Sequence, residues 1–317
     1  MREIALFERE LDETPIQALS DSYDDNRIFM KRDDLIPFSF GGNKARKAAE
    51  FYKEIKNADI DVVMTYGSNS SNHCRIVANM AAGMGISCHI ISPEEHREVL
   101  NNTKLVADFG ASVETCPVDK VSETIEHRKE AYRNEGRNPY FITGGGHGNP
   151  GTESYVKAYR EIERQEKRGG LYFDYIFHAS GTGATQAGLV CGQLLSGDMK
   201  RKIVGISIAR DRERGGNVVK DSIREYLAET FEKLYREEAL IFDDSYRLGG
   251  YGNYTEEVEK TIDFVMQREG IPMDTTYVGK AFHGMLGFLR EHQIQGKRIL
   301  FVHTGGAPLY FDRLTGK

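Results

Sequence analysis

Apolar runs alternate with longer amphipathic segments from residue 60 onward. A short continuous apolar run is typical of a buried strand, whereas an apolar stripe with a period of 3.6 residues indicates a helix. The pattern predicts strands at 61–66, 86–91, 112–116 and 139–143, with helices at 72–84, 94–109 and 119–135. Because helices connect successive strands, this series predicts a parallel sheet flanked by helices.

A second series of the same kind follows. It opens with a strand at 174–180, a glycine-rich turn and a helix at 187–195. Further strands are predicted at 202–209 and 298–304, and further helices at 216–236, 255–269 and 280–291. The polar segment 164–170 separates the two series and is predicted to be a linker. No internal repeat of fixed period is present.

Glycine-rich segments follow four of the predicted strands. They begin directly after Tyr66, Thr143, Ser180 and Thr304. In α/β proteins, ligands bind at the carboxyl ends of the strands. We therefore expect the functional groups of this chain to lie in these four segments.

Composition narrows the class of protein. The 317 residues suggest one large α/β domain or two closely packed ones. A net charge of −6 gives no electrostatic reason to expect binding to nucleic acid or to a membrane surface. The charged N-terminus does not resemble a signal peptide, and no apolar stretch approaches the roughly 20 residues of a membrane helix, so we expect a cytoplasmic protein. Four scattered cysteines without zinc-like spacing predict reduced thiols and no metal site.

Lys44 follows two glycines at the predicted start of a helix. Gly41 and Gly42 allow a tight turn that presents the lysine. A lysine forms imines readily when burial or neighbouring cations lower its pKa, and Arg46 and Lys47 lie nearby in sequence. Taken alone, the segment is also compatible with an ordinary surface lysine.

Two strand-to-helix turns carry polar groups. The segment 179–189 has Gly181 and Gly183, which free backbone N–H groups at a helix start for an anion such as phosphate. It does not match the Walker pattern, and an ordinary strand–helix turn remains open. The segment 66–75 contains Ser71, Asn72 and His73, of which simple helix capping explains only one.

Tyr251 and Tyr277 lie in two further glycine-containing segments. A phenol at such a place can donate a proton or bind a carboxylate. Each tyrosine taken singly is also compatible with ordinary aromatic packing.

Together these segments resemble the fold-type II pyridoxal-phosphate enzymes, and most closely their D-cysteine desulfhydrase and 1-aminocyclopropane-1-carboxylate (ACC) deaminase branch. The resemblance covers nearly the whole chain. The motifs, in the order of the family, are TPIQALS (14–20), KRDDL (31–35), GGNKARK (41–47), SNHCR (71–75), GTGATQAGL (181–189), YVGKAFHGM (277–285) and HTGGAP (303–308).

The resemblance implies a role for each motif. Lys44 holds pyridoxal 5′-phosphate as a Schiff base, Asn72 bonds its phenolic oxygen and Thr304 faces its ring nitrogen. The turn Gly181, Thr182, Gly183, Ala184 and Thr185 cradles the phosphate. Ser71, Asn72 and His73 face the substrate carboxylate or transfer protons, and Tyr251 and Tyr277 line the substrate side. Lys44, Ser71, Tyr251 and Tyr277 are the catalytic candidates.

Two positions bear on the reaction. In ACC deaminases a glutamate follows the tyrosine that matches Tyr277, and a leucine matches Thr304; this chain has Val278 and Thr304. An acidic partner keeps the ring nitrogen protonated, whereas a hydroxyl leaves it neutral. A neutral ring favours β-elimination with a good leaving group over cyclopropane opening.

The chain also departs from the family pattern. It has Ser70 where glutamine is usual, and Ala184 where glycine is common. The segment 142–154 is unusual and places His147 near the expected cleft, where it could bind an acidic substrate group or act as a base. A loop histidine without a role is the alternative.

The expected fold is an α/β, tryptophan synthase β-like architecture of two domains, with parallel sheets flanked by helices. A small domain (48–157) is inserted into a large cofactor-binding domain (1–47 and 158–317), and the cofactor lies in the cleft between them. A homodimer is the family expectation.

The expected reaction is β-elimination from a small amino acid, with D-cysteine giving pyruvate, sulfide and ammonia. ACC deamination, elimination from cysteate or diaminopropionate, and β-replacement remain alternatives, as does a non-enzymatic ligand-binding or regulatory protein. Substrate chirality stays open.

Overall fold

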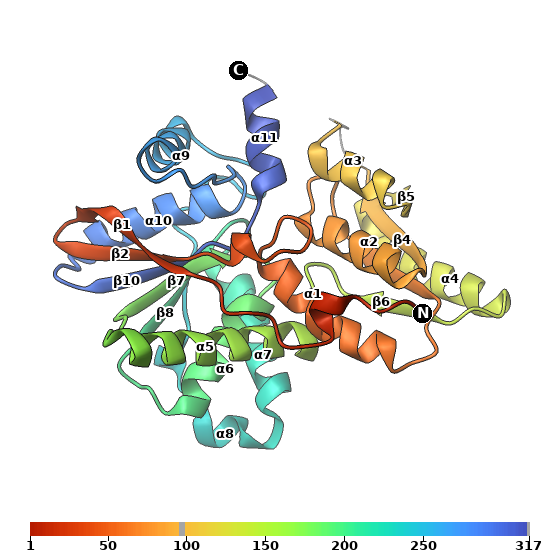
Figure 1. Cartoon of the computed structure of the whole chain (residues 1–317), viewed down its shortest axis with the longest axis horizontal. Coiled ribbons are helices and arrows are strands. Elements are labelled where there is room, and N and C mark those ends of the chain that lie inside the picture. Colours follow the sequence, from red (N-terminus) through yellow and green to blue (C-terminus); the bar gives the residue numbers. More distant parts are fainter. Residues whose placement is uncertain (95–98, 316–317) are drawn as a thin grey trace.

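The computed structural model describes residues 1–94 and 99–315, which form two sheets covered by helices (Figure 1). The larger sheet has six strands in the order β1-β2-β10-β7-β8-β9. Only β1 is antiparallel to its neighbour; all other pairs are parallel. The strands are β1 (Ile16–Tyr23), β2 (Asn26–Lys31), β7 (Tyr175–Ser180), β8 (Lys202–Ser207), β9 (Ile241–Asp243) and β10 (Arg298–Val302).

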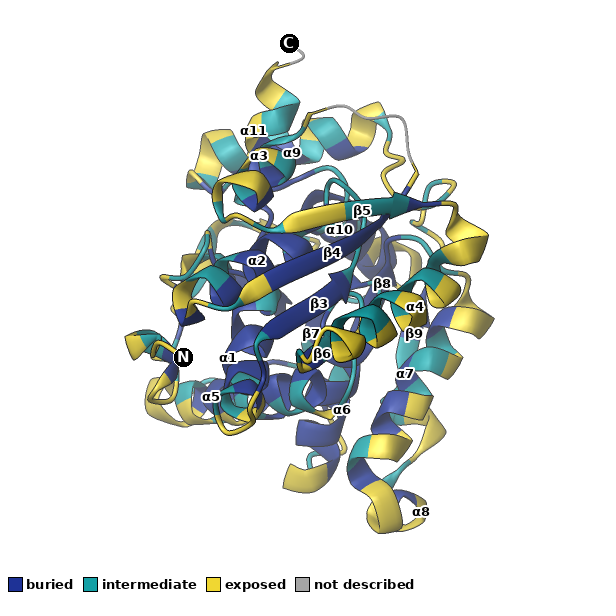
Figure 2. Cartoon of the chain, turned by 90° about the vertical axis from the view of Figure 1, so that its right-hand side faces the viewer, coloured by how far each residue is buried: buried dark blue, intermediate teal, exposed yellow. Residues whose placement is uncertain are grey.

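The smaller sheet has four parallel strands in the order β5-β4-β3-β6. They are β3 (Val62–Tyr66), β4 (Ser87–Pro93), β5 (Ser112–Cys116) and β6 (Pro139–Ile142). Figure 2 shows β3 and β4 buried in the middle of the sheet. Their buried residues belong to two hydrophobic cores, one shared with α1 (Asn43–Lys56) and α2 (Asn72–Met84), the other with α4 (Val121–Asn134).

Helices cover both faces of the larger sheet (Figure 1). On one face, α5 (Asn149–Gly169), α6 (Ala184–Ser196) and α7 (Arg212–Leu227) enclose one hydrophobic core. On the other face, α9 (Glu256–Glu269) and α10 (Val278–Glu291) enclose another. The remaining helices are α3 (Asn101–Asp108), α8 (Phe231–Leu234) and α11 (Ala307–Thr315). The predicted α/β architecture with parallel sheets flanked by helices is confirmed.

The prediction of a linker at 164–170 is wrong, because these residues form the last turns of α5 and its Gly170 cap. The prediction assumed that these polar residues are exposed, but Glu166 points inward. Both of its carboxylate oxygens lie 2.7 Å from Nη2 of the buried Arg201. The helix predicted at 216–236 begins earlier, at Arg212, and ends at Leu227. Ala228 interrupts it with a positive φ of 47°.

Several elements escaped the sequence pattern altogether: β1, β2, β9, α5 and α11. The helix predicted at 94–109 falls partly on 95–98, which lie outside the described residues; α3 covers its second half. Where the chain is described, none of its helices has the length and apolar character needed to cross a bilayer. The four cysteines are free and buried, as expected.

Candidate active site

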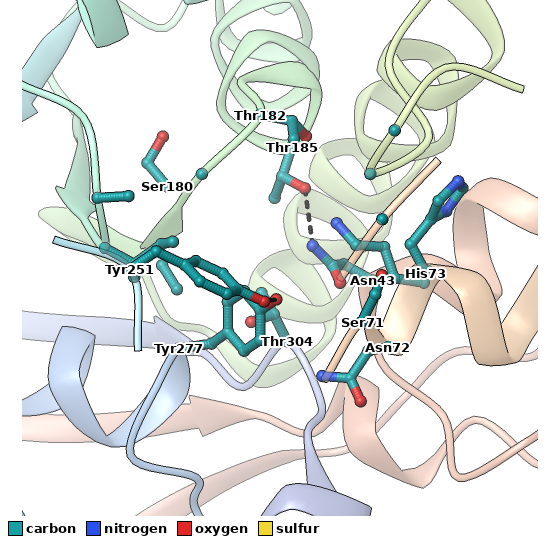
Figure 3. Close-up of a pocket in the computed structure, with 18 of the residues that line it drawn as sticks. Asn43, Ser71, Asn72, His73, Ser180, Thr182, Thr185, Tyr251, Tyr277 and Thr304 are labelled. Atoms are coloured by element: carbon teal, nitrogen blue, oxygen red, sulfur yellow. Dashed lines mark hydrogen bonds between the residues drawn. The ribbon is translucent and has the colours of Figure 1, made fainter. Parts of the chain in front are cut away.

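A cavity of about 480 Å³ lies where the carboxyl ends of strands from both sheets meet (Figure 3). Segments that follow β3 and β6 of the smaller sheet line it from one side. Segments that follow β7, β8 and β10 of the larger sheet line it from the other. All four glycine-rich segments singled out in the sequence therefore meet at one cavity.

Lys44 is the second residue of α1 and lines this cavity. Gly42, with a φ of 94°, precedes the helix, and a Cβ on it would lie 2.5 Å from the carbonyl oxygen of Thr304. The backbone N–H of Asn43 donates to the same carbonyl at 3.0 Å. The close approach of these two segments thus requires glycine and fixes the position of Lys44.

Burial lowers the pKa of Lys44 to about 8, against the opposing effect of a hydrogen bond with Lys47. Lys47, one turn further along α1, is buried and donates to the carbonyl of Gly145 at 3.0 Å. Burial and the charge of Lys44 hold the pKa of Lys47 well below its usual range. Within the described ranges neither lysine forms an ion pair with a carboxylate. Of the two lysines, Lys44 lines the cavity and Lys47 does not.

The expectation that Arg46 and Lys47 lower the pKa of Lys44 is wrong, since burial lowers it and the hydrogen bond with Lys47 opposes the lowering. The Arg46 guanidinium donates to Asp33 and Glu161 at 2.7 and 2.8 Å, on the side of α1 away from the cavity. Lys31 also binds Glu161 there. The charges of the KRDDL and GGNKARK motifs thus form a buried ion cluster that joins α1 to α5.

The turn 181–185 leads from β7 into α6 beside the cavity. Its Gly183 has a φ of 103°, and no side chain caps the helix, so the first N–H groups of α6 are free to bind an anion. The side chains of Thr182 and Thr185 line the cavity, and Asn43 donates to the Thr185 hydroxyl at 3.0 Å. Ala184 does not line the cavity.

Ser71, Asn72 and His73 begin α2 at the cavity wall. Ser71 is the N-cap: its Oγ accepts from the N–H of Cys74 at 3.2 Å. The His73 Nε2 lies 2.9 Å from the Thr65 hydroxyl. Burial, and then the charges of Lys44 and Lys47, lower the pKa of His73 well below its usual value, so the ring is neutral.

Tyr251 and Tyr277 line the cavity with their hydroxyl groups hydrogen-bonded to each other. The Tyr251 hydroxyl also lies 3.0 and 3.2 Å from the hydroxyls of Ser70 and Ser68. Burial raises the pKa of Tyr277 well above its usual value, so this phenol remains protonated. Figure 3 shows both rings beside Thr304.

Asp274 fixes the start of α10, where Tyr277 lies. Its carboxylate accepts from the backbone N–H groups of Thr276, Tyr277 and Val278. Val278 is buried outside the cavity lining, whereas Thr304 lines it.

His147 does not reach the cavity, contrary to the expectation from its segment. Its Nε2 lies 2.9 Å from the Ser222 hydroxyl on α7, and the ring is half-buried there. Burial lowers the pKa of His147, so the side chain is neutral and bonded away from the site.

Two functional candidates were missed from the sequence: Arg75 and Arg210. Arg210 follows β8 and lines the cavity, and its buried Nη1 has no hydrogen-bond partner among the residues that the structure describes. The sequence did not indicate Arg210, because no glycine-rich segment directly follows β8. Lys47 lies in the motif GGNKARK and Arg75 in SNHCR. Their positions in these motifs do not reveal which residues they bond in the fold.

Comparisons with known proteins agree with this geometry. The family model described as "Pyridoxal-phosphate dependent enzyme" matches residues 8–305. A Pyrococcus abyssi protein with a provisional 1-aminocyclopropane-1-carboxylate deaminase name is 32% identical over 305 residues, covering 94% of this chain and 91% of that protein. The D-cysteine desulfhydrase of Serratia proteamaculans is 32% identical over 314 residues, with 94% and 92% covered. A crystal structure of an ACC deaminase homologue superposes with a TM-score of 0.84 at 32% identity, covering 96% of this chain and 93% of that one.

Proposed function

The chain belongs to the pyridoxal-phosphate dependent enzymes, and we propose that it is a lyase that eliminates the β-substituent of a small amino acid, with D-cysteine as its foremost substrate. D-cysteine and water would give pyruvate, hydrogen sulfide and ammonia. The similarity to proteins named as desulfhydrases and deaminases supports this class of reaction.

Pyridoxal phosphate is the cofactor of this family, and the cavity suits it. The uncapped start of α6 favours a phosphate group, because its first N–H groups can bind an anion. Lys44 is the amine for covalent attachment, because its pKa of about 8 leaves a sizeable neutral fraction near neutral pH.

The choice of reaction depends on which of the described side chains line the cavity. Of the described residues that line the cavity, none is aspartate or glutamate, and Thr304 presents a hydroxyl. Among these described residues no acid is available to protonate the ring nitrogen. When bound, the cofactor supplies an electron sink for the substrate α-carbon, and a neutral ring suits a substrate whose β-substituent departs easily.

The side chains at the wall have separate tasks in this reaction. The N–H groups at the start of α2 and the Ser71 hydroxyl bind the substrate carboxylate. Lys44, Ser71 or Tyr251 removes the α-proton, depending on the chirality of the substrate. Arg210, which lines the cavity, supplies a positive charge that stabilises the departing anion.

The test is an assay of the pyridoxal-phosphate-loaded protein with D-cysteine. We expect equal amounts of pyruvate, sulfide and ammonium, and no product from Lys44→Ala. Wild-type protein that binds the cofactor but releases no pyruvate from D-cysteine would contradict the proposed substrate.

A panel of D- and L-amino acids separates the alternatives. Cysteate would release sulfite, diaminopropionate would release a second ammonia, and ACC would give a four-carbon keto acid. A β-replacement enzyme would form keto acid only when deprived of its added nucleophile. Bound cofactor with no turnover on any amino acid would favour a regulatory protein.

We also propose a homodimer located in the cytoplasm, built from a small domain (48–157) and a large one (1–47 and 158–317). All four strands of the smaller sheet fall within the inserted range, which supports this division. A mass of about twice 35.8 kDa by light scattering is expected for the dimer.

A further inference from the structure

Asn72 lines the cavity, and its hydrogen bonds determine which end of its side-chain amide faces the cavity. Figure 3 shows its nitrogen directed toward the side where Tyr277 and Thr304 lie, and its oxygen directed away. The Asn72 Oδ1 accepts two hydrogen bonds behind the wall, from Arg75 Nη1 at 2.6 Å and from Asn102 Nδ2 at 3.1 Å.

These partners permit only this orientation of the amide. A guanidinium can only donate hydrogen bonds, so it requires an oxygen opposite it. The Asn102 side chain is fixed in turn, since its Nδ2 donates to the Ser70 carbonyl at 2.8 Å and its Oδ1 accepts from Arg75 at 2.7 Å. Turning the Asn72 amide over would place its NH₂ group against two buried donors. The Asn72 group that faces the cavity is therefore a donor.

Arg75 has no partner that would explain it as a structural ion pair. Its side chain is fully buried, and within 1–94 and 99–315 it forms no salt bridge, while its Nε and Nη2 lack hydrogen-bond partners. Burial lowers the pKa of Arg75 to about 10, so it still carries its charge at neutral pH. Burying an uncompensated charge is costly, which indicates a purpose at this position.

We propose that Arg75 is a positioning residue which, with Asn102, holds Asn72 as a hydrogen-bond donor toward the phenolic oxygen of the cofactor ring. The proposal rests on the placement of pyridoxal phosphate in this cavity, but not on the identity of the substrate. The positive charge behind Asn72 also polarises its amide and strengthens the bond to an anionic oxygen.

The experiment is a pH titration of the visible absorption of the bound cofactor, without substrate. A donor at the phenolic oxygen stabilises the state in which the oxygen carries full negative charge. Arg75→Met should therefore move the titration midpoint upward, toward the shift of about one to two pH units expected for complete loss of a hydrogen bond to a charged group. The Arg75→Met variant keeps the other ionisable side chains of this part of the wall, which are Lys44, His73 and Tyr277.

Matched variants separate positioning from general damage. Arg137→Met removes a partly exposed arginine that bonds Asp61 and Ser87, away from the cavity, and should keep the wild-type midpoint. Asn72→Leu removes the donor itself and gives the full upward shift. Arg75→Lys retains the charge without the guanidinium fork, so it should shift the midpoint less than Arg75→Met.

Arg75→Met removes no partner of a buried carboxylate, so the protein is expected to fold. If it does not, Arg75→Lys and Asn102→Ala provide the same test with smaller upward shifts. The proposal is overturned if Asn72→Leu moves the midpoint while Arg75→Met, or these two substitutes, leaves it at the wild-type value. Because no substrate is present, failure of D-cysteine as a substrate would not produce that result.

Discussion

The low pKa of Lys44 predicts how the protein takes up its cofactor. The neutral amine is the nucleophile, and with a pKa of about 8 its fraction increases as the pH rises to 8 and then levels off. The rate of pyridoxal phosphate uptake by the cofactor-free protein should therefore increase about tenfold per pH unit well below 8 and become constant above it. Stopped-flow absorbance measures this rate. Lys44→Ala should show no covalent uptake, and a rate that continues to rise to pH 10 would contradict the lowered pKa.

The sequence predicted which side chains lie at the cavity better than it predicted which residues those side chains contact. Lys44, Ser71, Asn72, His73, Tyr251 and Tyr277 all lie at the cavity, because motifs at strand ends converge in a parallel sheet. The contact between Arg75 and Asn102 joins two helices, and spacing along one helix cannot reveal it. His147 was misplaced because a glycine-rich loop does not determine which way its side chain turns.

The start of α1 is the element on which cofactor attachment depends. Gly42→Ala would force a Cβ to within 2.5 Å of the Thr304 carbonyl in a backbone region that alanine avoids. We expect the free energy of unfolding to fall by more than about 2 kcal/mol and the affinity for pyridoxal phosphate to fall with it. Gly110→Ala is the control, since Gly110 also has a positive φ, of 74°, but nothing within 4 Å of an added Cβ. Urea unfolding should give a loss of about 1–2 kcal/mol for Gly110→Ala, with unchanged cofactor affinity.

The ion cluster behind α1 predicts a pH-dependent effect on stability. Burial raises the pKa of Asp33, but the charge and hydrogen bonds of Arg46 overcome this and lower it to about 2. The folded pKa lies below the unfolded one, so this pair stabilises the protein above about pH 4 and ceases to do so as the pH falls toward 2.

Arg46→Met should leave Asp33 buried without its hydrogen-bonded arginine, while Glu161 keeps Lys31, and cost about 3–5 kcal/mol at pH 7. The loss should be smaller at pH 4, because protonation then relieves the unpaired Asp33 carboxylate. Denaturant unfolding at both pH values measures the difference. Arg9→Met, which breaks an exposed pair with Asp12, should change stability by less than about 1 kcal/mol at either pH. An equal cost for Arg46→Met at both pH values would argue against the cluster as the cause.

Most of the predicted strands are short apolar runs that the structure buries in the middle of a sheet, such as β3 and β4. Each predicted strand is confirmed to within two residues at either end. The α5 helix was missed because it starts with turn-like residues at Asn149 and Pro150 and ends in a charged run. Its inward face carries Tyr155, Tyr159 and Glu166, whose polar atoms find partners only in the folded protein.

At the scale of the whole molecule, the cavity is shared by two sheets with separate hydrophobic cores. A ligand bound there contacts segments from both sides, so its binding free energy stabilises them together. A ligand at 100 times its dissociation constant adds about 2.7 kcal/mol to the stability of the folded state. This argument applies whether the two sheets belong to two domains or to one.

Hydrogen exchange with and without pyridoxal phosphate tests this coupling. Addition of the cofactor should slow exchange at the same time in 66–75 and 143–147, which follow strands of the smaller sheet, and in 180–186 and 304–306, which follow strands of the larger one. The helices α4 and α9, which do not line the cavity, should exchange at unchanged rates and serve as internal controls. Lys44→Ala should show weaker protection at all four segments, because the covalent attachment is lost while the phosphate is still bound. Protection restricted to 180–186 would mean that the cofactor binds the larger sheet alone and does not bridge the two.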